Sequence, residues 1–310
     1  MAELLRRYGT GLTVLAAALT AFWLLVLVIF PYLGLFEQSF RPYLPVVDVG
    51  GPKDFYSFNN YLTVFRGPTD IQLLGFKISV PIHLWVFAVT IIYSGLTTVV
   101  SLLMCYPIAY FMAKVISPKG LPTFLLLLVV PMWVSELLRA FAWFIILAFK
   151  GPLTITLQYL GIITDPVHWT WGLGGYSGVI IGLNYAYILF MLFPLYNAMS
   201  SLDTNQLEAA EDLGAKWWQT HWRVIVPYAK PGVASGCVTV FMLSVGSILV
   251  PTLVASPSSR WFTEIIQQWM FESQDWNTGA AYAFMLLIVC TLFVTLMMRF
   301  FKVGLADIAK

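Results

Sequence analysis

Long apolar stretches separated by polar segments dominate the hydrophobic pattern of this chain of 310 residues. A helix that crosses the hydrocarbon core of a membrane needs roughly 20 mostly apolar residues. Six stretches reach that length, and they predict transmembrane helices at about 11–36, 84–112, 121–149, 176–200, 231–255 and 278–301. An even number of spans places both termini on the same side of the membrane.

The positive charges orient these spans, because cytoplasmic segments of membrane proteins carry an excess of Lys and Arg. With the N-terminus inside, the inner segments carry ten such residues, which are Arg6, Arg7, Lys114, Lys119, Lys216, Arg223, Lys230, Arg299, Lys302 and Lys310. The outer segments then carry six, which are Arg41, Lys53, Arg66, Lys77, Lys150 and Arg260. We therefore expect cytoplasmic termini, and we divide the chain into an anchor helix with a long periplasmic segment, a core domain and a tail, at 1–83, 84–303 and 304–310.

Composition narrows the function classes. Hydrophobic residues make up 59% of the chain and charged residues only 10%, against roughly 25% charged in soluble proteins, so lipid must cover much of the surface. The 17 basic and 15 acidic residues form no basic run, which excludes nucleic acid as a partner. The three cysteines lie in apolar stretches and the three histidines show no metal-ligand spacing, so we expect neither a catalytic nor a metal site.

Two groups of glycines are spaced by four residues at the start of predicted spans. Small residues at this spacing leave a shallow groove on one helix face, where a neighbouring backbone can approach closely. The groups are Gly174, Gly178 and Gly182 before the fourth span, and Gly232 and Gly236 at the start of the fifth. We expect them to serve helix packing.

The segment 201–230 is the longest predicted cytoplasmic piece and the densest in charge. Asp203 is suited to cap a short helix, and Gly214 fits the left-handed residue that ends one. A second helix over about 216–225 is expected to stop before Pro227. The pattern therefore predicts two short helices joined by a glycine turn. A solvated loop with interfacial tryptophans would also be helical and charged, but the spacing is more specific than such a loop requires.

A spaced motif lies within this segment and consists of Glu208-Ala209-Ala210, three residues, Gly214, nine residues and Val224-Ile225-Val226-Pro227. It resembles the EAA loop of ATP-binding-cassette importer permeases, whose pattern is Glu-Ala-Ala, three residues, Gly, nine residues and Ile-x-Leu-Pro. The departures are conservative, since Val224 and Val226 stand in the Ile and Leu places. The loop also lies where this family has it, between late spans on the inner side.

The resemblance implies an all-α membrane protein with the type I importer-permease fold in a bacterial inner membrane. It implies a transport subunit rather than an enzyme, working with a second, non-identical permease, two cytoplasmic ATPase subunits and a periplasmic binding protein. The helix over 203–214 would dock on the ATPase, with coupling carried by Glu208, Ala209, Ala210, Asp212, Gly214 and Pro227. ATP and Mg²⁺ would bind the ATPase, because this chain contains no Gly-x-x-x-x-Gly-Lys-Ser/Thr phosphate loop.

Three further stretches are similar to the spermidine/putrescine-type permeases. They are Tyr106-Pro107-Ile108-Ala109-Tyr110, Val130-Pro131-Met132-Trp133 followed by Arg139, and Asp275-Trp276 with Gly279-Ala280-Ala281. This similarity implies a polyamine or a related cationic solute as the substrate. Opines, amino acids and other small organic solutes stay open as alternatives, since related subunits for those solutes share much of the pattern.

Only two ionisable acid or base side chains fall well inside a predicted span, Glu136 and Arg139. Each costs roughly 2.5–3.5 kcal/mol at a helix centre, so an intramembrane charge suggests a functional site. Their i, i+3 spacing places them on one helix face, where they could instead form a structural ion pair. Both interpretations stay open.

In the functional interpretation, Glu136 attracts a cationic substrate and Arg139 positions it or closes a gate. Trp133, three residues before Glu136, would add a cation–π surface on the same face, and Trp143 would extend that face. The opposite wall would come from aromatic residues of the fourth span, although such residues more often serve packing. They are Tyr185, Tyr187 and Phe190.

Two other classes compete with the importer permease. A secondary transporter would also span the membrane repeatedly, but it has no use for an EAA-type loop and would show several embedded charge clusters or helices broken at mid-membrane. An intramembrane enzyme needs paired carboxylates, Ser with His, or a histidine metal site at membrane depth. No histidine lies within a predicted span.

Overall fold

The computed structural model describes residues 2–48, 50–73, 76–167, 169, 176–255 and 259–304. Packing divides the chain into two units, of which the first comprises Met1–Pro68 with Ile266–Met285 and the second Thr69–Ile265 with Leu286–Lys310. These units differ from the predicted division at 83/84 and 303/304, which stays a prediction. Within the described residues, five helices are long and apolar enough to cross a membrane, and a bent helix pair supplies a sixth span.

The first unit is built around a long N-terminal helix. Its elements are α1 (Ala2–Leu24), the π turn η1 (Leu25–Ile29), α2 (Phe30–Ser39), the 3₁₀ turns η2 (Val46–Asp48) and η3 (Thr63–Phe65), α3 (Asn59–Leu62), the π turn η8 (Gln268–Glu272) and the first part of α14 (Trp276–Phe301). Gly9 kinks α1 with a φ of 76°, a conformation that glycine adopts without a Cβ clash. The continuous stretch Gly9–Ser39 is long and apolar enough to span a membrane, in agreement with the span predicted at 11–36.

The polar segment that follows α2 is held by side-chain hydrogen bonds rather than by regular secondary structure. The Nδ2 atom of Asn60 donates to the carbonyl oxygens of Ser39 and Arg41, at 3.0 and 2.7 Å. The Nδ2 atom of Asn277 also donates to the Arg41 carbonyl, at 2.9 Å, and the Arg41 guanidinium pairs with Asp54 at 3.0 Å. A hydrogen bond from Arg41 to the Glu37 carboxylate raises the pKa of the arginine above its usual value. Residues distant in sequence thus hold the start of the predicted periplasmic segment in place.

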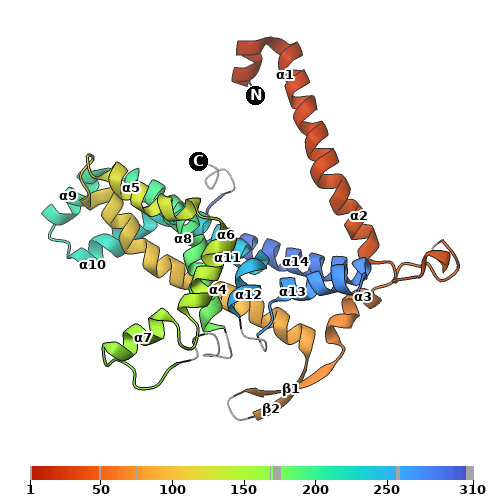
Figure 1. Cartoon of the computed structure of the whole chain (residues 1–310). Helices are drawn as coiled ribbons and strands as arrows, with labels where there is room; N and C mark the ends of the chain where they lie inside the picture. The colour runs from red at the N-terminus through yellow and green to blue at the C-terminus, as the bar shows by residue number, and fades with distance from the viewer. Residues whose placement is uncertain are drawn as a thin grey trace. The chain divides into compact units, whose positions relative to one another are not determined.

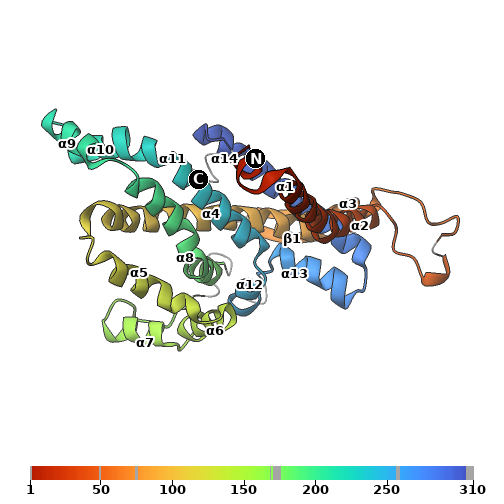
Figure 2. The ribbon, with the colours of Figure 1, turned by 90° about the horizontal axis from the view of Figure 1, so that it is seen from above.

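The second unit is a helical bundle that follows a two-stranded sheet (Figure 1). Its elements are β1 (Pro68–Leu73), β2 (Phe76–Pro81), α4 (Ile82–Tyr110), η4 (Phe111–Val115), α5 (Leu121–Val129), η5 (Val130–Trp133), α6 (Glu136–Ile146), α7 (Pro152–Tyr159), α8 (Ser177–Ser200), α9 (Thr204–Asp212), α10 (Trp217–Thr220), η7 (His221–Ile225), α11 (Val226–Gly246), α12 (Leu249–Val254), α13 (Phe262–Gln267) and the remainder of α14. The helices α4, α8 and α11 pack on one another and form its centre, as Figure 2 also shows.

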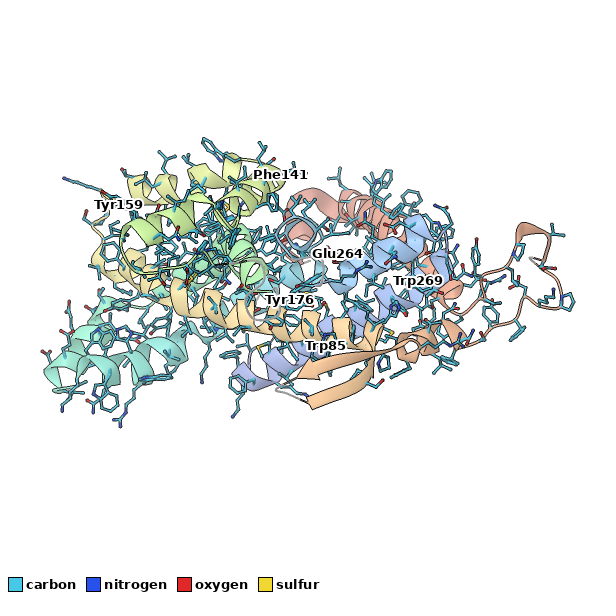
Figure 3. The ribbon with its side chains drawn as sticks, turned by 60° about the horizontal axis from the view of Figure 1, so that its bottom comes forward. Trp85, Phe141, Tyr159, Tyr176, Glu264 and Trp269 are labelled. Atoms are coloured by element: carbon cyan, nitrogen blue, oxygen red, sulfur yellow. The ribbon has the colours of Figure 1, made fainter. Side chains whose placement is uncertain are left out.

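Two buried apolar clusters fill the second unit. One lies between α4, α8 and α11 and includes Cys105, Met191 and Val240, all fully buried. The other surrounds Trp261, which is also fully buried and donates from its indole nitrogen to the carbonyl of Ser244 at 3.2 Å. Its members Tyr176 and Trp85 are labelled in Figure 3, where Phe141 and Tyr159 point away from the bundle.

Glycines at the start of α11 permit the close approach that their spacing predicts. A methyl group on Gly232 would lie 2.4 Å from the carbonyl oxygen of Pro194, and one on Gly236 would lie 2.7 Å from the sulfur of Met191. In the other group, a methyl group on Gly182 would lie 2.7 Å from Val250, whereas Gly174 lies outside the described residues. Packing of α11 against α8 therefore depends on the absent side chains.

The third span is not the single helix over 121–149 that the hydropathy predicts. It breaks between Trp133 and Glu136, and the two halves are bent by 88°. Ser135 caps the second half, because its hydroxyl accepts a hydrogen bond from the Leu138 amide at 3.3 Å. Broken helices were expected of secondary transporters and not of this chain. Because the third span is broken, that criterion does not distinguish the two classes.

The fifth span begins earlier and ends earlier than the predicted 231–255. One continuous helix runs over Trp217–Gly246, so the expected stop before Pro227 is wrong. The π turn η7 precedes this proline, with the Val226 amide donating to the His221 carbonyl. Pro227 then falls in the first turn of α11, where a proline fits a helix without breaking it. Beyond Gly246 the chain is extended at Ser247 and resumes as α12.

Candidate functional site: a cytoplasmic coupling loop and an intramembrane pocket

The short helix α9 forms where the sequence predicts it. Asp203 lies at its N-cap in an extended conformation, and the aspartate Oδ1 accepts from the Asn205 amide at 3.0 Å. Gly214 follows the helix with a φ of 74°, which agrees with the expected left-handed residue. A rigid helix with a defined direction is therefore held at this end of the second unit (Figure 1).

Most of α9 and its turn is exposed. Leu207 is partly buried against the core between α4, α8 and α11, and Ala210 is half-buried. Leu213 is 89% exposed although it is apolar. The remaining exposed residues of this stretch include the expected coupling residues Glu208, Ala209, Asp212 and Gly214, together with Glu211. The exposed surface is thus acidic with one apolar side chain at its tip.

The helix α10 continues this surface after the glycine turn. The Lys216 amide donates to the Gln219 side chain at 2.9 Å, which fixes the start of α10. Three tryptophans project outward there, with Trp217 73%, Trp218 52% and Trp222 69% exposed. Pro227, the last residue of the spaced motif, lies apart from α9, within the first turn of α11.

Within the membrane, Glu136 lies at the broken end of the third span. It is the first residue of α6, where the helix dipole favours a negative charge. The hydroxyl of Tyr187 on α8, only 8% exposed, donates to its carboxylate at 3.0 Å. The structure therefore brings together a carboxylate and an aromatic residue that the sequence placed on opposite walls.

Arg139 does not pair with Glu136 in the described part of the chain. Its Nη1 atom lies 2.6 Å from the sulfur of Met132, and its Nε atom is buried without a hydrogen-bond partner. It lines a pocket of about 460 Å³, and the other lining residues are Met132, Ala186, Leu189, Phe190, Phe193, Pro194 and Thr239. The predicted structural ion pair is therefore wrong: both residues lie on α6, but the Arg139 side chain turns to Met132 and a mostly apolar cavity.

Two of the predicted aromatic residues have different outcomes. Trp133 lies before the 88° bend and is 74% exposed, so it does not share a helix face with Glu136 as expected. Trp143 lies on α6 and its ring centroid is 5.5 Å from that of Tyr185, in an edge-to-face arrangement. Trp133 and Glu136 are three residues apart, but the helix breaks between them, so this spacing does not place them on one face.

Sequence reasoning missed Ser135 and the pocket residues Met132, Phe193 and Thr239. A signal for Ser135 was present, since a serine followed by an acidic residue after Pro131 is typical of a helix that stops and starts again. No comparable signal marks Phe193, which differs from its apolar neighbours only in the direction that the packed helices give it, or Thr239, whose hydroxyl bonds its own helix at the Ser235 carbonyl.

Comparison with known proteins is consistent with this arrangement. Residues 105–303 match the family described as binding-protein-dependent transport system inner membrane component. The chain is 32% identical over 276 residues to the spermidine/putrescine transport system permease protein PotB of Haemophilus influenzae, covering 88% of each chain. It is also 32% identical over 277 residues to PotB of Escherichia coli, covering 89% of this chain and 93% of the relative.

A solved structure shares the fold over nearly the whole length. A chain of a bacterial alginate ABC transporter, crystallised with an alginate pentasaccharide-bound periplasmic protein, aligns with a TM-score of 0.71 at 18% identity and covers 98% of both chains. The EAA-like loop, the apolar spans and the family match agree. The chain belongs to the inner-membrane components of binding-protein-dependent transport systems, and it is the multi-pass permease subunit of an ABC importer that works with an ATPase and a substrate-binding protein.

Proposed function

We propose that α9 is the coupling helix through which the ATPase drives this permease, with Glu208, Ala209, Ala210, Asp212 and Gly214 as the contact residues. One observation carries the proposal, namely that α9 is a capped helix fixed at its base and exposed at its tip, where Leu213 is 89% exposed. A rigid element of this kind transmits a rigid-body movement. Pro227 supports the loop indirectly, by holding the start of α11.

A site-specific cross-link tests the docking. The three native cysteines are buried, so a cysteine introduced at an exposed position is the accessible thiol. In the assembled importer, Leu213→Cys is expected to cross-link to the ATPase subunit. The matched control is Tyr159→Cys on α7, which is 90% exposed and should not cross-link. Equal labelling of the ATPase from both positions, or from neither, would contradict the docking.

We further propose that the solute is a polyamine such as spermidine or putrescine. Both PotB relatives are named for those solutes, and Glu136 with Tyr187 offers a carboxylate beside an aromatic hydroxyl at membrane depth. A carboxylate in this environment attracts an ammonium group strongly, because little water screens the charge. Of the remaining predicted path residues, Trp143 and Tyr185 would extend the aromatic wall, and Arg139 would position the solute or close a gate. Trp133 is 74% exposed and lies before the bend, so we leave it out of the path.

The remaining partners follow from the same proposal. We expect a second permease that is related to this chain but not identical to it. We also expect ATP and Mg²⁺ to bind only the two ATPase subunits, since this sequence has no phosphate-binding loop. The energy of hydrolysis would then reach the pocket only through α9 and the helices attached to it.

A further inference from the structure

The cytoplasmic end of α4 contacts the chain on both sides of α9. Ahead of α9, the ammonium group of Lys114 in η4 donates a hydrogen bond to the carbonyl of Leu202, one residue before the cap Asp203. After α9, the hydroxyl of Tyr106 lies 2.9 Å from Nδ1 of His221 in η7. These two hydrogen bonds, here called the two ties, involve residues on opposite sides of α9 in the sequence. Both have their other partner in the segment 106–114.

The second tie is packed as well as hydrogen-bonded. His221 is only 6% exposed, and its ring centroid lies 4.6 Å from that of Tyr110 and 4.2 Å from that of Trp217. Trp217 is the first residue of α10, immediately after the glycine turn that ends α9. An aromatic contact therefore leads from the exposed Trp217 through the buried His221 to Tyr110 on α4, and the close packing around His221 resists relative movement.

The same end of α4 is fixed to the core of the second unit. Cys105, Ala109 and Met112 are buried in the cluster that α4 shares with α8 and α11. The segment 106–114 thus contacts the flanks of α9 and the core together, since Tyr106 and Tyr110 also pack against the core cluster. A displacement of α9 cannot occur without either breaking the two ties or moving this end of α4.

We propose that Tyr106 and Lys114, with His221, form a clamp that transfers the movement of α9 to the cytoplasmic end of α4. They are positioning residues, since none of them touches the nucleotide or the solute pocket. The inference rests on the proposed role of α9 as the coupling helix. It assigns the receiving element within this chain, which the spaced motif of the loop does not specify.

The test uses the complete importer in proteoliposomes and measures solute taken up per ATP hydrolysed. Tyr106→Phe removes one hydroxyl and keeps the ring, and Lys114→Met removes the other donor. A hydrogen bond of ordinary strength corresponds to about a two- to tenfold change in an equilibrium, so each variant should lower the uptake per ATP by about that factor. Subunit assembly and ATP hydrolysis should stay close to wild type, a pattern that a merely structural defect would not give.

Matched controls accompany each variant. Tyr196→Phe on α8 removes a hydroxyl from the same core, and Lys119→Met removes an exposed charge near η4, and both should couple normally. Lys114→Arg retains a donor and should restore most of the coupling. If Tyr106→Phe and Lys114→Met take up as much solute per ATP as their controls, the clamp is wrong.

A covalent tie supplies a second measurement that does not depend on weakening the fold. Lys114→Cys and Ser201→Cys, the second at an exposed position next to Leu202, bridged by a short thiol cross-linker, should leave most of the transport intact, because a clamp moves as one body. Loss of transport on bridging would overturn the proposal. The Leu213→Cys cross-link to the ATPase separates the clamp from the docking of α9. If the cross-link forms and the clamp variants couple normally, only the clamp is refuted. If the cross-link does not form, the docking of α9 is refuted.

Discussion

At the scale of single residues, the hydrogen bond between Tyr187 and Glu136 makes a testable prediction about the solute. Glu136→Gln removes the negative charge and keeps the size, so uptake of a polycation should fall by about tenfold or more. Tyr187→Phe, which removes only the donor at 3.0 Å, should have a smaller effect, about two- to tenfold. Radiolabelled uptake by the complete importer measures both.

The control for these variants is a substitution at Trp133, which lies apart from Glu136 in the structure. Trp133→Phe, at a position 74% exposed and before the bend, should transport like wild type. If Glu136→Gln transports a polyamine as well as this control does, the carboxylate serves structure alone. Assembly with the ATPase should be unchanged in all three variants.

The importance of Glu136 could be predicted from the sequence, but its hydrogen-bond partner could not. Composition predicts that Glu136 is important, because a carboxylate inside a span is costly wherever it lies. Its partner could not be predicted, because Arg139 lies three residues later on the same helix without pairing with it, whereas the partner Tyr187 comes from α8. The packing of α6 against α8 brings the Tyr187 hydroxyl to the carboxylate, and the sequence carries no signal for that contact.

At the scale of elements, the contact between α11 and α8 predicts a stability effect. Gly232→Ala places a methyl group 2.4 Å from a backbone oxygen, which cannot move like a flexible side chain. Overpacking of this kind typically costs about 1–3 kcal/mol, so the melting temperature of the purified complex should fall. Gly95→Ala in α4 is the control, because nothing lies within 4 Å of its added methyl group. An equal melting temperature for the two variants would contradict the packing argument.

The predicted elements agree with the structure where hydropathy alone decides and differ where local backbone chemistry does. The span at 11–36 and that at 278–301 are close to the helices Gly9–Ser39 and Trp276–Phe301. The break near Ser135 was missed because both sides of it are apolar, so a hydropathy pattern passes through it. The continuation past Pro227 was missed because a π turn, which leaves no simple sequence signal, accommodates the proline.

At the scale of the whole molecule, the chain carries the proposed path and the proposed docking helix, and its sequence contains no Gly-x-x-x-x-Gly-Lys-Ser/Thr phosphate loop. As the permease subunit of an ABC importer, it depends on an ATPase and a substrate-binding protein, so the protein by itself is an incomplete transporter. The second permease proposed above would complete the membrane-spanning part.

Transport should therefore depend on every subunit at once. Proteoliposomes that contain this chain, the second permease and the ATPase should take up spermidine or putrescine only under two conditions. ATP must be present on the side of the ATPase, and the binding protein must be present on the opposite, periplasmic side. The purified permease alone should bind no nucleotide, because the sequence lacks a phosphate loop. Uptake of opines or amino acids in place of polyamines would change the solute class and leave the coupling intact. Uptake driven by an ion gradient without the ATPase would contradict the whole scheme, since α9 would then have no partner to receive force from.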